Sequence, residues 1–103
     1  MLNNENYKEV LNNEDKSILM ISGQGCANCV SMFPIVNTFV ENYPQVVLHI
    51  IEADEVYRGL VEHYGVDQIP SILLFDKGNL LAKVSGYQPY EIFEIYATDK
   101  FRL

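Results

Sequence analysis

The chain has 103 residues, of which 49% are hydrophobic and 20% charged, and its formal net charge is −7. This length favours a single domain, residues 1–103, and the apolar share is sufficient for a core that needs no disulfide bonds to hold it. The negative charge argues against nucleic acid or an anionic membrane surface as the main partner. The apolar runs, such as Val46-Val47-Leu48, are far too short to span a bilayer.

The first half of the chain predicts two strands and two helices. A short helix is expected over residues 5–12, and residues 17–22 are mostly apolar, which is typical of a strand buried on both faces. A long helix over residues 28–42 contains Pro34, which we expect to kink it. The apolar face predicted for this helix consists of Val30, Phe33, Val36, Val40 and Tyr43, with Met32 and Phe39 beside it. Residues 46–52 predict the second strand.

The second half predicts a helix, a hairpin and a final helix. Residues 55–64 form the expected helix, with Val56, Leu60 and Val61 facing inward and Gly65 as its C-terminal cap. Strands over residues 72–75 and 80–85 are antiparallel and joined by a turn at residues 76–79. A last helix runs from Pro89 to about Lys100. Its expected apolar stripe is Ile92, Phe93, Ile95 and Tyr96.

This order of elements predicts an α/β fold. The handedness of crossover connections places the first two strands side by side and parallel. The expected architecture is a central four-stranded mixed sheet flanked by helices on both faces.

The chain's two cysteines, Cys26 and Cys29, lie between the first strand and the long helix. A strand would deliver Cys26 to the end of the sheet, where the N–H groups and dipole of the helix N-terminus favour an anion. The thiolate is the nucleophilic form of cysteine, and a helix N-terminus lowers the pKa of a thiol. The spacing therefore predicts a redox-active pair with an exposed Cys26 as nucleophile.

Metal binding is the alternative for these residues. A closed zinc site needs four ligands, and His49 and His63 have spacings unlike those of a zinc finger. The acidic residues Glu52, Asp54 and Glu55 are compatible with a divalent cation, but a solvated strand end is the favoured interpretation. We therefore expect no metal; the remaining alternative is a cluster held by the two cysteines of each of two chains.

Several sequence marks together resemble the thioredoxin family over about residues 16–101. They are Cys26-Ala27-Asn28-Cys29, Pro34, Ala53-Asp54, Tyr64-Gly65-Val66, Ile69-Pro70, Phe75-Asp76-Lys77-Gly78 and Gly86. The resemblance implies a thioredoxin-like fold in which Pro70 follows a cis peptide bond and its loop packs against the cysteine pair. It also implies that the backbone of Ile69 meets an extended substrate segment. The expected rim of the substrate site is Gly25, Ile69, Pro70 and Tyr87.

The chain departs from the family pattern around the cysteines. Gly25 replaces the usual Trp before the first cysteine, and Val30 stands where a cation often follows the second. The family's buried acid maps to Met20, and its lysine partner to about Ile50. Neither side chain transfers protons, so Cys29 must lose its proton to water, a backbone group or another residue.

The resemblance implies a thiol–disulfide oxidoreductase that reduces protein disulfides through Cys26 and Cys29. Its redox centre would be the cysteine pair itself, without a cofactor, and a separate reductase would recycle it. The alternative is a thioredoxin-fold binding or accessory module with weak turnover. An oxidase or isomerase of exported proteins would need a signal sequence, which residues 1–6 do not resemble. We therefore expect a cytoplasmic monomer that acts on disulfide-containing proteins.

Overall fold

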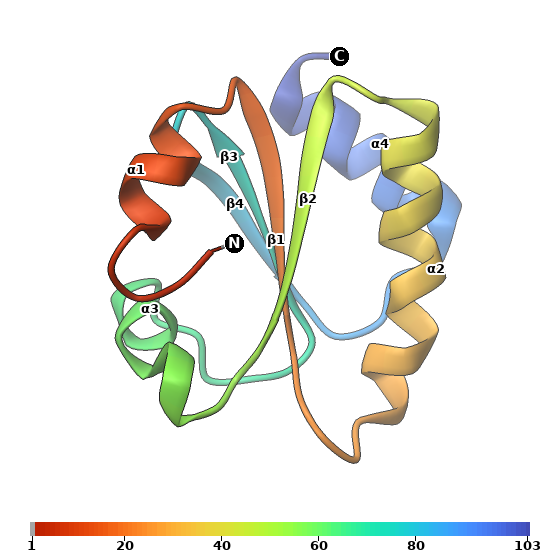
Figure 1. Cartoon of the computed structure of the whole chain (residues 1–103). Helices are drawn as coiled ribbons and strands as arrows, with labels where there is room; N and C mark the ends of the chain where they lie inside the picture. The colour runs from red at the N-terminus through yellow and green to blue at the C-terminus, as the bar shows by residue number, and fades with distance from the viewer. Residues whose placement is uncertain (1) are drawn as a thin grey trace.

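The computed structural model describes residues 2–103, which form a four-stranded sheet with helices on both faces (Figure 1). The elements are, in chain order, α1 (Tyr7–Asn12), β1 (Lys16–Ser22), α2 (Ala27–Asn42), β2 (Val46–Glu52), the 3-10 helix η1 (Glu55–Tyr57), α3 (Arg58–His63), β3 (Ser71–Asp76), β4 (Asn79–Ser85) and α4 (Tyr90–Phe101). Each predicted strand, and each predicted helix other than that over residues 55–64, is present within a few residues of its expected bounds, which confirms the α/β class.

Strand β1 lies inside the sheet, whose order is β2-β1-β3-β4. It runs parallel to β2 and antiparallel to β3, and β3 and β4 form the predicted antiparallel hairpin. Residues 17–22 of β1 are buried, as their apolar character predicts. Because β1 has a partner strand along both edges, its position in the sheet is fixed on both sides.

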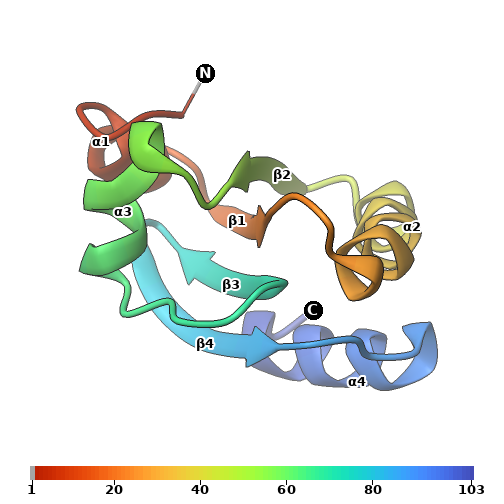
Figure 2. The same cartoon turned by 90° about the horizontal axis from the view of Figure 1, so that it is seen from below.

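The apolar residues form two clusters, one on each face of the sheet. Helices α2 and α4 cover one face, and α1 and α3 cover the other (Figures 1 and 2). The buried members of the first cluster are Ile18, Met20, Cys29, Met32, Val36, Phe39, Val46, Ile72, Leu74, Phe93, Ala97 and Phe101. Those of the second are Leu2, Tyr7, Leu11, Leu19, Ile21, Ile51, Leu60, Leu73 and Phe75. Alternate residues of β1 thus supply both cores, since successive side chains of a strand point to opposite faces.

The hairpin turn between β3 and β4 has two central residues, Lys77 and Gly78. Both have positive φ angles, 50° and 83°, and the flanking Asp76 and Asn79 are paired across the strands. This is the arrangement of a type I′ turn, whose twist matches that of the strands it joins. The sequence signal Asp-Lys-Gly-Asn therefore predicted this hairpin correctly.

The inward faces of two helices differ from those predicted. In α2 the buried residues are Cys29, Met32, Val36 and Phe39, whereas Val30 is 67% exposed. In α4 the buried residues are Phe93, Ala97 and Phe101, and the side chains of Ile92, Ile95 and Tyr96 are exposed. Residues 93, 97 and 101 form one stripe because side chains four positions apart share a helix face. The buried stripe of α4 therefore differs from the predicted one. In α2 the prediction is wrong at Val30, whereas Phe33, Val40 and Tyr43 pack against the core as expected.

The predicted helix over residues 55–64 is divided in two. Asp54 Oδ1 accepts a hydrogen bond from the backbone N–H of Val56 at 3.0 Å, which caps the short 3-10 helix η1 before α3 begins. Val56 is consequently exposed rather than inward, while Leu60 is buried as predicted. Gly65 follows Tyr64, the C-cap residue of α3, and has a φ of 64°, the conformation that favours glycine at a helix C-terminus.

We predict that the two helix faces of α4 differ sharply in their contribution to stability. Phe93→Ala should lower the free energy of unfolding by about 3–5 kcal/mol, because it removes a buried aromatic ring and leaves a cavity. Ile95→Ala, at a position 69% exposed in the same helix, should change it by less than about 0.5 kcal/mol. Equilibrium denaturation in urea measures both. Equal losses in the two variants would contradict the observed orientation of α4.

A second prediction concerns alkaline pH. Tyr43 donates a hydrogen bond to Glu94 at 3.0 Å, which ties α2 to α4, and this hydrogen bond raises the pKa of Tyr43 above 10.0. The neutral phenol is thus favoured by folding, so its stabilising effect is present below pH 10 and is lost as the pH rises through the raised value. As the pH rises through the raised pKa, the stability of Tyr43→Phe should therefore fall less than that of the parent protein.

Thermal unfolding followed from neutral to alkaline pH tests this expectation. The control is Tyr87→Phe, which removes the hydroxyl of an exposed tyrosine and should retain the alkaline loss of the parent protein. Identical alkaline profiles for Tyr43→Phe and the parent would show that the hydrogen bond to Glu94 has no such effect.

Candidate active site

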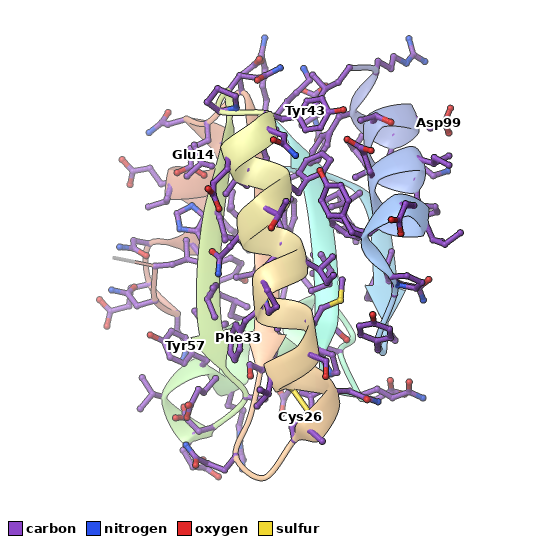
Figure 3. The ribbon with its side chains drawn as sticks, turned by 90° about the vertical axis from the view of Figure 1, so that its right-hand side faces the viewer. Glu14, Cys26, Phe33, Tyr43, Tyr57 and Asp99 are labelled. Atoms are coloured by element: carbon purple, nitrogen blue, oxygen red, sulfur yellow. A yellow bond between two sulfur atoms is a disulfide. The ribbon has the colours of Figure 1, made fainter. Side chains whose placement is uncertain are left out.

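The two cysteines lie where β1 passes into α2. Cys26 is the N-cap residue of α2, and its sulfur accepts a hydrogen bond from the backbone N–H of Cys29 at 3.1 Å. The two sulfur atoms form a disulfide bond of 2.20 Å, visible at the end of α2 in Figure 3. The sulfur of Cys26 therefore lies at the positively polarised end of a helix of 16 residues, where a thiolate is favoured.

The two sulfurs differ in their access to solvent. Cys26 is half-buried, whereas Cys29 is only 1% exposed and belongs to the core between the sheet and α2. An incoming disulfide can thus reach Cys26 but not Cys29. In the reduced protein this difference gives the pair two roles, an attacking sulfur at position 26 and a resolving sulfur at position 29.

A short loop, residues 23–25, connects β1 to Cys26. Gly25 has a φ of 64°, in the left-handed region that favours glycine. The side-chain amide of Gln24 donates to both carboxylate oxygens of Glu52, at 3.2 Å each. The loop is therefore fastened to the end of β2, next to the strand from which it emerges.

The loop before β3 lies at the same end of the sheet as the cysteines (Figure 1). The peptide bond between Ile69 and Pro70 is cis, and the carbonyl of Pro70 accepts a hydrogen bond from the N–H of Gly86 at 2.9 Å. A Cβ atom at Gly23 would lie 2.6 Å from Cδ1 of Ile69. Glycine at position 23 therefore allows the Ile69 side chain to pack against the loop that carries Cys26.

The structure brings most of the sequence-predicted site residues together. Gly25, Cys26 and Cys29 line one open pocket of about 480 Å³. Ile69 is 37% exposed and reaches this area through its contact with Gly23. Pro70 is buried, and Tyr87 is 45% exposed and follows Gly86, the residue that binds the Pro70 carbonyl. Ile69, Pro70 and Tyr87 are not among the residues that line the pocket itself.

Seven further residues line the pocket that were not predicted as site residues. They are Ser22, Gly23, Gln24, Ala27, Val30, Phe33 and Glu52. Figure 3 shows Phe33 on the side of α2 that faces β2. The register of the parallel strands pairs Ser22 with Glu52, which places a carboxylate beside the strand that leads to Cys26. The alignment of the ends of β1 and β2 would have indicated Glu52 as a site residue. This alignment depends on the strand register, which the sequence alone does not give.

The polar character of the site is acidic rather than basic. Within residues 2–103, no Lys, Arg or His side chain lines the cysteine pocket, and its one carboxylate is that of Glu52. Beneath the site, Met20 is buried and pairs in register with Ile50 on β2, so these two strand positions provide no ionisable group. Among the described residues, no three His, Cys, Asp or Glu side chains are placed to hold a metal ion.

No helix within the described part of the chain is both long and apolar enough to cross a bilayer.

The chain has matches among known protein families and individual proteins. The model of the family described as Thioredoxin matches residues 1–98. Thioredoxin-1 of Saccharomyces cerevisiae is 31% identical over 74 residues, covering 72% of this chain and 71% of that protein. Thioredoxin of Alicyclobacillus acidocaldarius is 24% identical over 102 residues, covering 95% and 93%, respectively.

The fold has matches among solved structures as well. The oxidised form of mitochondrial thioredoxin 3 of Saccharomyces cerevisiae has a TM-score of 0.85 at 21% identity, covering 96% of this chain and 92% of that one. This likeness concerns the fold, while the family match extends over nearly the whole sequence. With its disulfide-bonded Cys26 and Cys29 at the start of α2, the chain belongs to the thioredoxin family and is a thiol–disulfide oxidoreductase.

Proposed function

We propose that the protein reduces disulfide bonds of other proteins in a reducing compartment such as the cytoplasm. The observation that carries this proposal is the difference between its two sulfurs, since Cys26 lies half-buried at the helix N-terminus and Cys29 lies beneath it in the core. In such a pair, one sulfur attacks the target disulfide, and the other sulfur then closes the disulfide within the pair. In a reducing compartment a paired cysteine motif serves exchange chemistry rather than structural cross-linking.

In the first step, the thiolate of Cys26 attacks one sulfur of the target disulfide. A new bond forms between this sulfur and Cys26, the target's own S–S bond breaks, and its second sulfur leaves as a thiolate that takes up a proton. The N-terminus of α2 favours the attacking thiolate at position 26. This step leaves a mixed disulfide between the two proteins.

In the second step, the sulfur of Cys29 loses its proton and attacks Cys26. The bond between Cys26 and the target breaks, the target sulfur leaves reduced, and the Cys26–Cys29 disulfide forms. Two electrons have then passed from the cysteine pair to the target. A separate reductase returns the pair to the dithiol state, so the cysteine pair is the redox centre and no cofactor takes part.

The substrate is proposed to bind on the rim formed by Gly25, Ile69, Pro70 and Tyr87. Ile69 and Tyr87 offer exposed apolar surface at the end of the sheet that carries Cys26. The contact of Ile69 with Gly23 joins this surface to the loop that carries the attacking sulfur. An extended segment around a target disulfide would thus lie across both loops. The protein is proposed to act as a monomer.

Replacement of each cysteine provides the main test. Cys26→Ser should abolish the reduction of insulin, because the attacking sulfur is removed. Cys29→Ser should also stop turnover, but it should accumulate a mixed disulfide with the substrate, because the resolving sulfur is missing. Insulin precipitation measures turnover, and non-reducing electrophoresis detects the mixed disulfide. Insulin reduction by Cys26→Ser at the parent rate would contradict the assignment.

A further test addresses the proposed rim. Ile69→Ala should raise KM for insulin by roughly tenfold, because it removes apolar contact area with the bound segment. The reaction of Cys26 with a small disulfide such as oxidised glutathione should be affected much less, since a small substrate needs little of the rim. Ile95→Ala, on the exposed face of α4, is the matched control and should leave both reactions unchanged. An unaltered KM in Ile69→Ala would remove Ile69 from the substrate site.

A further inference from the structure

The second step of the proposed reaction requires a proton to leave Cys29. This side chain is 1% exposed, and the core around it includes the thioether side chains of Met20 and Met32. Burial among apolar side chains disfavours a thiolate, so the reaction needs a nearby group that takes the proton as the sulfur attacks. The backbone N–H of Cys29 cannot serve, because it is a donor and is directed to the sulfur of Cys26.

The strand residues directly beneath the cysteines cannot accept this proton. Met20 on β1 is fully buried and has no ionisable group, and its register partner on β2 is Ile50. The nearest strand position that carries a carboxylate is two residues further along β2, at Glu52. Side chains two positions apart in a strand point to the same face, so Glu52 lies on the same face of β2 as Ile50.

The cysteine pocket connects Cys29 with Glu52. Both residues line it, together with Ser22, which is nearly buried and is the register partner of Glu52. The pocket volume is about 480 Å³. Because a water molecule occupies about 30 Å³ in the liquid, the pocket has room for a short chain of water between the thiol and the carboxylate. The Ser22 hydroxyl offers both a donor and an acceptor to such a chain.

The carboxylate of Glu52 is held at this pocket. The Gln24 side chain donates to both of its oxygens at 3.2 Å each, and Gln24 belongs to the loop that leads to Cys26. A carboxylate has about four lone-pair sites, so these two contacts leave sites free to accept further hydrogen bonds. Within residues 2–103, Glu52 contributes the one carboxylate that lines the pocket.

We propose that Glu52 accepts the proton of Cys29 through water in the cysteine pocket. The inference rests on the proposed reductase function and assigns a role to a residue within that mechanism. As the proton moves to the Glu52 carboxylate, the electron pair of the Cys29 sulfur forms the bond to Cys26. The target sulfur departs as a thiolate with the electrons of the broken bond and takes up a proton. Glu52 returns to its ionised form by passing its proton to this leaving thiolate or to solvent.

The reaction of the reduced protein with 5,5′-dithiobis(2-nitrobenzoate) separates the two steps. Attack by Cys26 releases the first coloured thiolate and leaves a mixed disulfide, and attack by Cys29 then releases the second. Stopped-flow absorbance measures both rates as a function of pH. Glu52→Gln should leave the first rate unchanged and slow the second, by about tenfold near pH 6, at the lower end of what a positioned base provides. The two proteins should converge at high pH, where the thiol ionises without a base.

Two further variants distinguish a proton acceptor from a general effect. Glu55→Gln removes a carboxylate near the same strand end but outside the cysteine pocket, and both of its rates should match those of the parent. Glu52→Asp retains a carboxylate and should restore much of the second rate. An equal second rate in Glu52→Gln and Glu55→Gln at every pH would overturn the proposal. Slowing of both steps by the same factor at every pH would also overturn it, since that indicates a displaced loop.

The same measurements separate this inference from the proposed function. Failure of the parent protein to reduce insulin would contradict the reductase role, while the two-phase reaction with the small disulfide would still report on Glu52. Conversely, normal insulin reduction with no effect of Glu52→Gln on the second phase would reject Glu52 and leave the reductase role intact.

Discussion

The structure depends above all on the pairing of β1 with a strand on each side. Its backbone is hydrogen-bonded to β2 along one edge and β3 along the other, and both of its faces are buried. The register with β2 continues past the strand end, where the N–H of Ala53 donates to the carbonyl of Ser22 at 2.8 Å. The register with β3 pairs Ile21 with Ser71, the residue after Pro70. The positions of Glu52 and of the cis-proline loop relative to the cysteines therefore both follow from this one strand.

Elements with a strong local signal were predicted correctly, whereas the orientation of α4 was not. The hairpin turn is encoded by adjacent residues, since Lys77 and Gly78 adopt the positive φ angles that the turn requires. Helix α4, in contrast, has apolar side chains on more than one face, and its sequence alone does not say which face meets the sheet. Ala97 and Phe101 complete the buried stripe with Phe93, and this choice depends on the shape of the sheet surface beneath the helix.

The same distinction applies to the site. The cysteines could be identified from their spacing, because the strand and helix on either side of them were evident in the sequence. Glu52 could not be identified as a site residue, since its place beside the cysteines depends on the register of β1 with β2 and on contact with Gln24, 28 residues earlier. In isolation a carboxylate at the end of a strand is indistinguishable from an ordinary solvated residue. The role of Glu52 follows from the pocket that it lines together with the cysteines.

The conformation of Gly25 constrains how this motif can change in evolution. Nothing lies within 4 Å of the position that a Cβ atom would occupy there, so the surroundings leave room for a side chain. The obstacle is the backbone, because a φ of 64° costs other residues about 1–2 kcal/mol. A lineage cannot therefore acquire the tryptophan typical of the family at this position by one unstrained substitution. A change in the path of the loop of residues 23–25 would remove this cost, so the effect of a tryptophan at position 25 depends on the rest of the loop.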